Sequence, residues 1–195
     1  MPKLIAFYGS PGGGKTSVAL KAAMETYIQT KDEVVAFLSP DTIVPSIALL
    51  FPNYSPDEVV SLSEIFDNTA ITSESLLKNA VTVKSMKDFF ALGFKAGENR
   101  FSFPTPTPEK INSLFSALSD VAGYIFFDCT NDETDEISKK AISKNELVNG
   151  KFVVEGYFEQ PEIISETLQR KLLQFGVSQN ELVRFLEKGA DYGDI

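Results

Sequence analysis

A glycine-rich segment near the start of the chain has the residues of a phosphate-binding loop. It fits the pattern G-x-x-x-x-G-K-[ST] and consists of Gly9, Ser10, Pro11, Gly12, Gly13, Gly14, Lys15 and Thr16. Glycines allow several backbone N–H groups to point at one phosphate, and a helix that begins there adds partial positive charge. The pattern predicts that Lys15 contacts the β- and γ-phosphates and that Thr16 supplies a hydroxyl ligand to Mg²⁺. We assign Gly9 to Ser17 to nucleotide binding.

A bound magnesium ion needs a carboxylate nearby, and Asp128 is the candidate. It ends the apolar run Gly123 to Asp128, which is typical of a buried strand. Parallel strands end at a common edge of a sheet, so Asp128 is expected beside the phosphate-binding loop. We interpret it as the Walker B aspartate. The alternative is an ordinary aspartate that caps a turn at the end of a strand.

Other carboxylates follow strand ends as well. Asp41 comes after the apolar run Glu33 to Leu38 and could position the attacking water, or it could cap a turn or helix from Thr42 to Leu50. Four acidic residues after Asp128 are most simply the acidic first turn of a helix, which its dipole favours. These are Asp132, Glu133, Asp135 and Glu136. Cys129 is expected to be a small packed side chain.

The composition excludes several other kinds of chemistry. The chain has no histidine, which rules out Ser-His-Asp and Cys-His catalysis and all histidine-based metal sites. The formal net charge is −9, and the three arginines, Arg100, Arg170 and Arg184, are far apart. Sequence-specific DNA binding is therefore not expected. With one cysteine, no apolar run long enough to span a membrane and no secretory signal pattern, the chain is expected in the reducing cytoplasm.

Apolar runs alternate with helix patterns along the 195 residues. Strands are predicted at Lys3 to Tyr8, Glu33 to Leu38, Val81 to Val83, Phe89 to Phe94, Gly123 to Asp128 and Lys151 to Phe158. Helices are predicted at Lys15 to Gln29, from Ser55 onward, and at Thr72 to Asn79, Thr107 to Asp120, Asp132 to Ser143, Gln160 to Phe175 and Ser178 to Lys188. Between them, Arg100 to Pro108 has three prolines and is read as a surface loop.

This alternation predicts an α/β fold of the P-loop NTPase type, with a mostly parallel sheet and helices on both faces. We expect one ATPase domain over residues 1–195, with 145–195 as a divergent or shortened C-terminal part.

Residues 3 to 140 resemble the ParA/MinD-like ATPases. The resemblance is carried by the P-loop, by the segment Ser39 to Ser46 (SPDTIVPS), which is similar to the family's D-x-D-x-x-x-P-S stretch, and by YIFFDCT around Asp128. It implies that Asp41 assists hydrolysis and that ATP promotes a face-to-face dimer. Lys15, Asp41 and Asp128 are then the catalytic residues, and Thr16 and Asp128 hold Mg²⁺.

The chain departs from the family at the start of the loop. Ser10 stands where the family has a lysine that reaches the partner's nucleotide, so hydrolysis is expected to be slow. The acidic chain is closest to members that position protein machinery, and a protein partner is expected.

Alternative classes are a small-molecule P-loop kinase and a nucleotide-controlled scaffold without turnover. AAA+ motors usually have a glutamate directly after the Walker B aspartate, where this chain has Cys129. GTPases carry an [NT]-K-x-D signature that is missing here, so ATP is expected over GTP.

Overall fold

The computed structural model describes residues 2–8, 14–30, 32–51, 61–83, 85–130, 132 and 134–149. The predicted helix start at Ser55 lies outside these ranges. So do the strand and the two helices predicted between Lys151 and Lys188.

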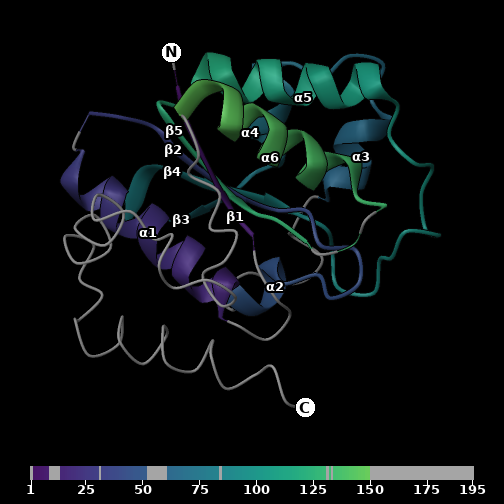
Figure 1. Cartoon of the computed structure of the whole chain (residues 1–195), viewed down its shortest axis with the longest axis horizontal. Coiled ribbons are helices and arrows are strands. Elements are labelled where there is room, and N and C mark those ends of the chain that lie inside the picture. Colours follow the sequence, from purple (N-terminus) through teal and green to yellow (C-terminus); the bar gives the residue numbers. More distant parts are fainter. Residues whose placement is uncertain are drawn as a thin grey trace.

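The described part of the chain contains a five-stranded sheet whose strand order is β1-β5-β2-β4-β3 (Figure 1). Neighbouring strands are parallel, except that β3 runs antiparallel to β4. The strands are β1 (Lys3–Phe7), β2 (Val35–Ser39), β3 (Val81–Val83), β4 (Met86–Gly93) and β5 (Tyr124–Asp128). The predicted α/β class with a mostly parallel sheet is confirmed.

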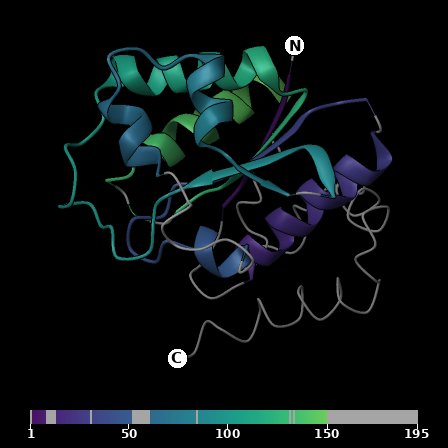
Figure 2. The same cartoon turned by 180° about the vertical axis from the view of Figure 1, so that it is seen from behind.

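Helices cover both faces of the sheet, as Figures 1 and 2 show. One face packs against α1 and α2, and the other against α3 to α6. The helices are α1 (Lys15–Gln29), α2 (Ile47–Leu50), α3 (Leu62–Asp67), α4 (Ser73–Asn79), α5 (Pro108–Val121) and α6 (Glu136–Asn149).

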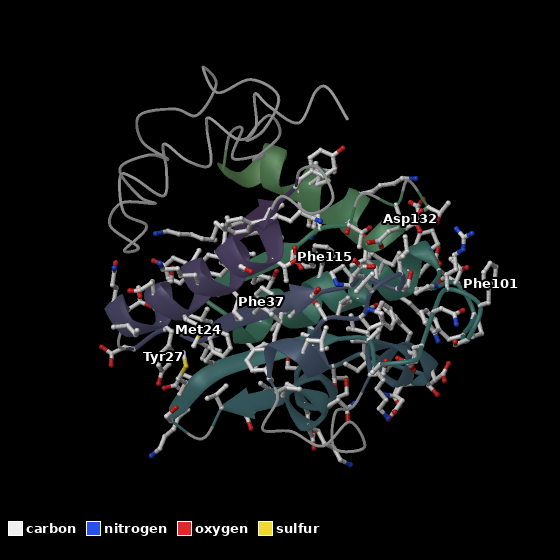
Figure 3. The ribbon with its side chains drawn as sticks, turned by 90° about the horizontal axis from the view of Figure 1, so that it is seen from below. Met24, Tyr27, Phe37, Phe101, Phe115 and Asp132 are labelled. Atoms are coloured by element: carbon white, nitrogen blue, oxygen red, sulfur yellow. The ribbon has the colours of Figure 1, made fainter. Side chains whose placement is uncertain are left out.

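The central strands are apolar throughout because both of their faces are buried. In β5, Phe127 stacks on Phe115 of α5 with ring centroids 5.0 Å apart. The neighbouring Phe126 points to the other face and stacks on Phe7 at 6.2 Å. Successive side chains of a strand point to opposite faces, so one strand contributes to two cores. Figure 3 shows Phe115 within the molecule, while the exposed Phe101 lies at its rim.

The helix predicted from Asp132 to Ser143 is displaced in the structure. It begins at Glu136 and continues to Asn149, and Asp132 lies before it in a turn. Asp135 accepts hydrogen bonds through Oδ1 from the backbone N–H groups of Ile137 (3.0 Å) and Ser138 (3.3 Å), as a helix cap does. The interpretation of all four acidic residues as a first helical turn is therefore wrong for Asp132 and Asp135.

The capping role of Asp135 leads to a stability prediction. Asp135→Ala removes the acceptor for two N–H groups and for the Thr130 hydroxyl, which donates to Oδ2 at 2.9 Å. We expect the free energy of unfolding to fall by about 1 to 2 kcal/mol, measured by urea denaturation. Asp135→Asn keeps an oxygen that can accept the two backbone bonds and is expected to recover most of the loss. Equal midpoints for Asp135→Ala and the wild type would contradict this role.

Candidate nucleotide and magnesium site

Strands β1 and β5 end side by side, which brings the start of the glycine-rich segment close to Asp128. These strands are neighbours and parallel, and Phe7, the last residue of β1, pairs with Asp128. Beyond that pair, the N–H of Cys129 donates to the Phe7 carbonyl at 2.9 Å. The chain that leaves β1 toward the glycine-rich segment therefore starts beside Asp128.

The glycine-rich segment is described from Gly14 onward, and residues 9–13 lie outside the described ranges. Gly14 is the N-cap of α1 and has a φ of 76°, in the left-handed region that favours glycine. Lys15 and Thr16 follow in the first turn of α1, and Ser17 is exposed. The predicted helix Lys15 to Gln29 is confirmed, so Lys15 and Thr16 lie at the positive end of a helix.

Asp128 is buried, with 4% of its surface exposed. The Ser39 hydroxyl donates to its Oδ2 at 3.1 Å, while Oδ1 has no hydrogen-bond partner among the described residues. Burial raises the pKa of Asp128; a hydrogen bond from Thr16 and the positive charge of Lys15 act in the opposite direction. The structure thus brings three predicted site residues, Lys15, Thr16 and Asp128, into one neighbourhood.

Asp41 belongs to the same neighbourhood, because its negative charge contributes to the raised pKa of Asp128. Its Oδ1 accepts hydrogen bonds from the N–H groups of Ile43 (2.7 Å) and Val44 (3.0 Å), which closes a turn. The expected helix from Thr42 is wrong in its start, since α2 begins at Ile47. Asp41 therefore shapes a turn directly beside the candidate site.

Two serines at this edge were missed as site residues. Ser39, at the end of β2, is fully buried, and its hydroxyl lies 2.8 Å from that of Ser46. The sequence signal was Ser39 itself, a hydroxyl that closes an apolar strand at the edge where ligands of such sheets gather. Its partner Ser46 is seven residues away and could not be paired with it from spacing.

Cys129, next to Asp128, is fully buried, as expected of a small packed side chain. Burial is the main cause that raises the pKa of its thiol, so the thiol stays protonated at neutral pH. It has no role as a nucleophile in this arrangement.

The residues present fit a magnesium ion that is shared with a nucleotide. Among the described residues, the buried Oδ1 of Asp128 has no hydrogen-bond partner, and Thr16 brings a hydroxyl to the same carboxylate. Within the described ranges no cluster of three or more Cys, Asp or Glu side chains could hold a metal alone. Mg²⁺ usually binds through one or two protein groups and completes its shell with phosphates and water.

Comparison of the sequence with models of known protein families and with curated proteins finds no match. Across the described residues, no helix combines the length and the apolar character needed to cross a membrane. The assignment of function therefore rests on the motif and on the geometry around Asp128.

Proposed function

We propose that the chain is a P-loop ATPase that binds ATP with Mg²⁺. The observation that carries the proposal is the buried Oδ1 of Asp128, which has no hydrogen-bond partner among the described residues. It lies beside Thr16 and Lys15, at the edge where the glycine-rich segment follows β1. A buried polar atom without a partner costs free energy, and a bound cation would offset that cost.

The proposed roles follow from the chemistry of each group. The backbone N–H groups of the glycine-rich segment, apart from Pro11, would cradle the phosphates, and Lys15 would neutralise charge on the β- and γ-phosphates. Thr16 and Asp128 would hold Mg²⁺. In this proposal the chain is an atypical member of the ParA/MinD-like ATPases, and its nucleotide state controls assembly or partner binding. The resemblance of the segment Ser39 to Ser46 and of the residues around Asp128 to that family supports this part of the proposal.

Two substitutions at Asp41 separate a role in hydrolysis from a role in the turn. Asn keeps an oxygen that can accept from Ile43 and Val44 but has no charge, whereas Ala loses both properties. If Asp41 positions or activates water, both variants bind ATP and hydrolyse it about 100-fold more slowly in single-turnover assays. Near-wild-type hydrolysis by Asp41→Asn, with only Asp41→Ala impaired, would show that Asp41 acts through the turn alone.

Assembly is proposed to depend on nucleotide. Three large apolar side chains in the residues that follow Asp41 in the chain are exposed: Ile43 (69%), Val44 (59%) and Leu49 (74%). Such side chains suit contact with a second copy or a protein partner. Without a lysine at Ser10 and with a net charge of −9, repulsion between two chains is expected to keep an ATP-induced dimer weak.

Salt that screens this repulsion is expected to strengthen the dimer. Sedimentation of the ATP-bound chain at low and high salt measures the effect. A tight ATP-dependent dimer at low salt would show that another residue replaces the missing lysine.

The direct test of the proposed activity is release of phosphate from ATP, with GTP as the competitor. We expect slow turnover that requires Mg²⁺. We also expect excess GTP to inhibit this turnover only weakly. Saturable ATP binding without phosphate release, even under single-turnover conditions, would instead support a nucleotide-controlled scaffold. A clear preference for GTP would contradict the assignment.

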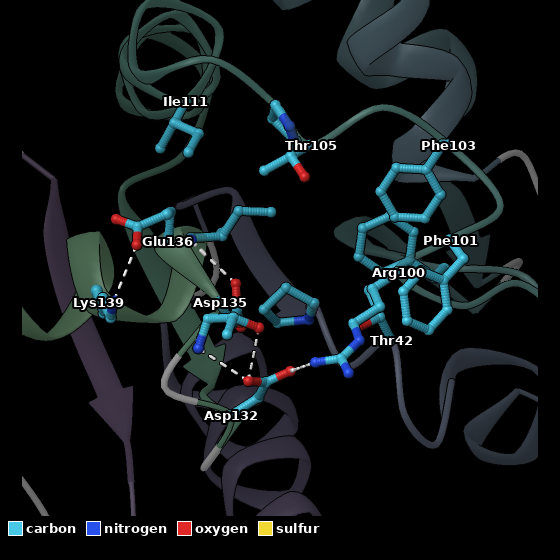
Figure 4. A pocket seen from close by; sticks show the side chains of 15 residues that line it. Thr42, Arg100, Phe101, Phe103, Thr105, Ile111, Asp132, Asp135, Glu136 and Lys139 are labelled. Atoms are coloured by element: carbon cyan, nitrogen blue, oxygen red, sulfur yellow. Dashed lines mark hydrogen bonds and ion pairs between the residues drawn. The ribbon is translucent and has the colours of Figure 1, made fainter.

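A second candidate, a small-molecule kinase, is favoured by a cavity of about 550 Å³ at the same edge of the sheet (Figure 4). Thr42 and Asp132 both line it, so it lies beside segments that follow β2 and β5. Phe94 and Phe103, stacked at 4.7 Å, form an apolar wall, and Arg100 lies at the rim. A cavity of this size could hold an acceptor for the γ-phosphate.

The electrostatics of this cavity favour the ATPase over the kinase. Arg100 faces Asp132 at 3.9 Å, so its charge is partly offset. Asp135 and Glu136 add further negative charge to the wall, and Lys139 pairs with Glu136 at 2.9 Å. A kinase needs uncompensated positive charge around the transferring phosphoryl group.

The two activities can be distinguished by incubating the chain with ATP and a protein-free mixture of small metabolites. The ratio of released phosphate to ADP is then measured. Hydrolysis gives one phosphate for each ADP, whereas transfer to an acceptor gives ADP without phosphate.

A further inference from the structure

Two hydroxyl groups connect Asp128 to the segment that carries Asp41. The Ser39 hydroxyl donates to Asp128 Oδ2 at 3.1 Å and lies 2.8 Å from the Ser46 hydroxyl. A hydroxyl has one proton, and Ser39 uses its proton on the carboxylate. Ser46 must therefore donate to Ser39, which fixes the direction of the chain from Ser46 through Ser39 to Asp128.

Ser46 makes this contact with its side chain and does not use that side chain to cap α2. It is the N-cap residue of α2, where a serine side chain normally accepts a bond from the backbone of the first helical turn. Here its side chain makes no capping bond. The hydroxyl contacts Ser39 instead. This contact replaces the capping bond that Ser46 would normally make within α2.

The segment between the two serines is held at both ends. At its start, Asp41 closes a turn through Ile43 and Val44. At its end, Ile47 is fully buried, and a Cβ placed on Gly93 would lie 2.1 Å from Ile47 Cγ1. That close approach requires glycine in β4 and fixes the start of α2 against the sheet. The position of residues 40–46 therefore depends on the turn at Asp41 and on the packing of Ile47 against Gly93.

We propose that Ser39 is a positioning residue that couples the magnesium ligand Asp128 to segment 40–46. By occupying Oδ2, Ser39 leaves Oδ1 as the oxygen available to the metal. Through Ser46, the same hydroxyl sets the position of the segment that contains Asp41 and the exposed Ile43 and Val44. The coupling role rests on the proposed function; the hydrogen-bonded chain itself does not.

The first arm of the test needs no nucleotide, so it judges the chain of hydrogen bonds alone. Amide hydrogen exchange at Ile43 and Val44 is measured in the wild type, Ser39→Ala, Ser46→Ala and Asp128→Ala. We expect each variant to speed exchange about five-fold, the effect of losing one hydrogen bond. The double variant of Ser39 and Ser46 is expected to add nothing, because either change breaks the same chain.

The matched control is Ser119→Ala, which removes a hydroxyl bonded to the Phe115 carbonyl within α5, at 2.8 Å. It is expected to leave exchange at Ile43 and Val44 unchanged, and exchange within α5 reports whether each variant is folded. Unchanged exchange in Ser39→Ala, or additive effects in the double variant, would overturn the proposal.

The second arm adds ATP and Mg²⁺. The coupling predicts that binding protects Ile43 and Val44 in the wild type and that Ser39→Ala and Ser46→Ala, compared at saturating ATP, lose about five-fold of that protection. If both variants keep the protection, the coupling is refuted. If Ser39→Ala abolishes binding, Ser39 acts on the metal site alone and the coupling is again refuted. A wild type that does not bind ATP refutes the proposed function, while the first arm still decides the hydrogen-bonded chain.

Discussion

Lys15→Ala is expected to weaken binding of ATP–Mg²⁺ about 10- to 100-fold. A lysine that contacts phosphate makes charge-assisted hydrogen bonds, and their loss leaves phosphate charge uncompensated at the start of α1. The side chain is only half-buried and its positive charge acts on Asp128 at the site, so the fold is expected to survive. Fluorescence titration with a labelled ATP analogue measures the affinity of the folded variant.

The control for this substitution is Lys87→Ala, which removes an exposed lysine from β4. Both variants lower the positive charge of the chain equally, so a general electrostatic effect would appear in both. Only Lys15→Ala is expected to lose affinity. Equal affinity in Lys15→Ala and the wild type would refute the assignment of Gly9 to Thr16 as a phosphate cradle.

Asp128→Asn is expected to abolish the gain in ATP affinity that Mg²⁺ provides and to slow hydrolysis by more than about 100-fold. A neutral amide is a poor magnesium ligand, and the metal supplies several kcal/mol of charge stabilisation in phosphoryl transfer. Binding of ATP without metal is expected to change little. Titrations with and without Mg²⁺ separate the two effects.

The same variant is expected to keep or raise the free energy of unfolding at neutral pH. Burial raises the pKa of Asp128 in the folded chain, so its charged form costs stability at pH values above the pKa of the unfolded chain. Asparagine removes that cost. Asp120→Asn, an exposed position on α5, is the control. Undiminished magnesium dependence in Asp128→Asn would show that the metal binds elsewhere.

The sequence predicted most of the central fold because its local signals agree. Alternation of buried runs and helix patterns located every strand of the described sheet to within three residues. Thr107 and Pro108 marked the start of α5, since a hydroxyl caps a helix and proline suits its first position. The proximity of Asp128 to Lys15 followed from a general property of parallel sheets, that strands end at a shared edge.

What could not be predicted depends on contacts between distant residues. Spacing alone did not show that Ser39 lies against Asp128, since the two are brought together only by the pairing of β2 with β5. The start of α6 was placed too early because an aspartate favours both the cap and the first turn of a helix. In the structure, the Thr130 hydroxyl and two backbone N–H groups donate to Asp135, which identifies Asp135 as the helix cap.

The central claim is that this chain binds ATP with Mg²⁺ between its glycine-rich segment and Asp128. Isothermal titration of ATP into the wild-type chain, with Mg²⁺ and then with a chelator, tests it most directly. The account predicts saturable binding of one ATP per chain, with a clear loss of affinity when the metal is removed. Absence of saturable heat in the presence of Mg²⁺, from a chain shown to be folded, would contradict it.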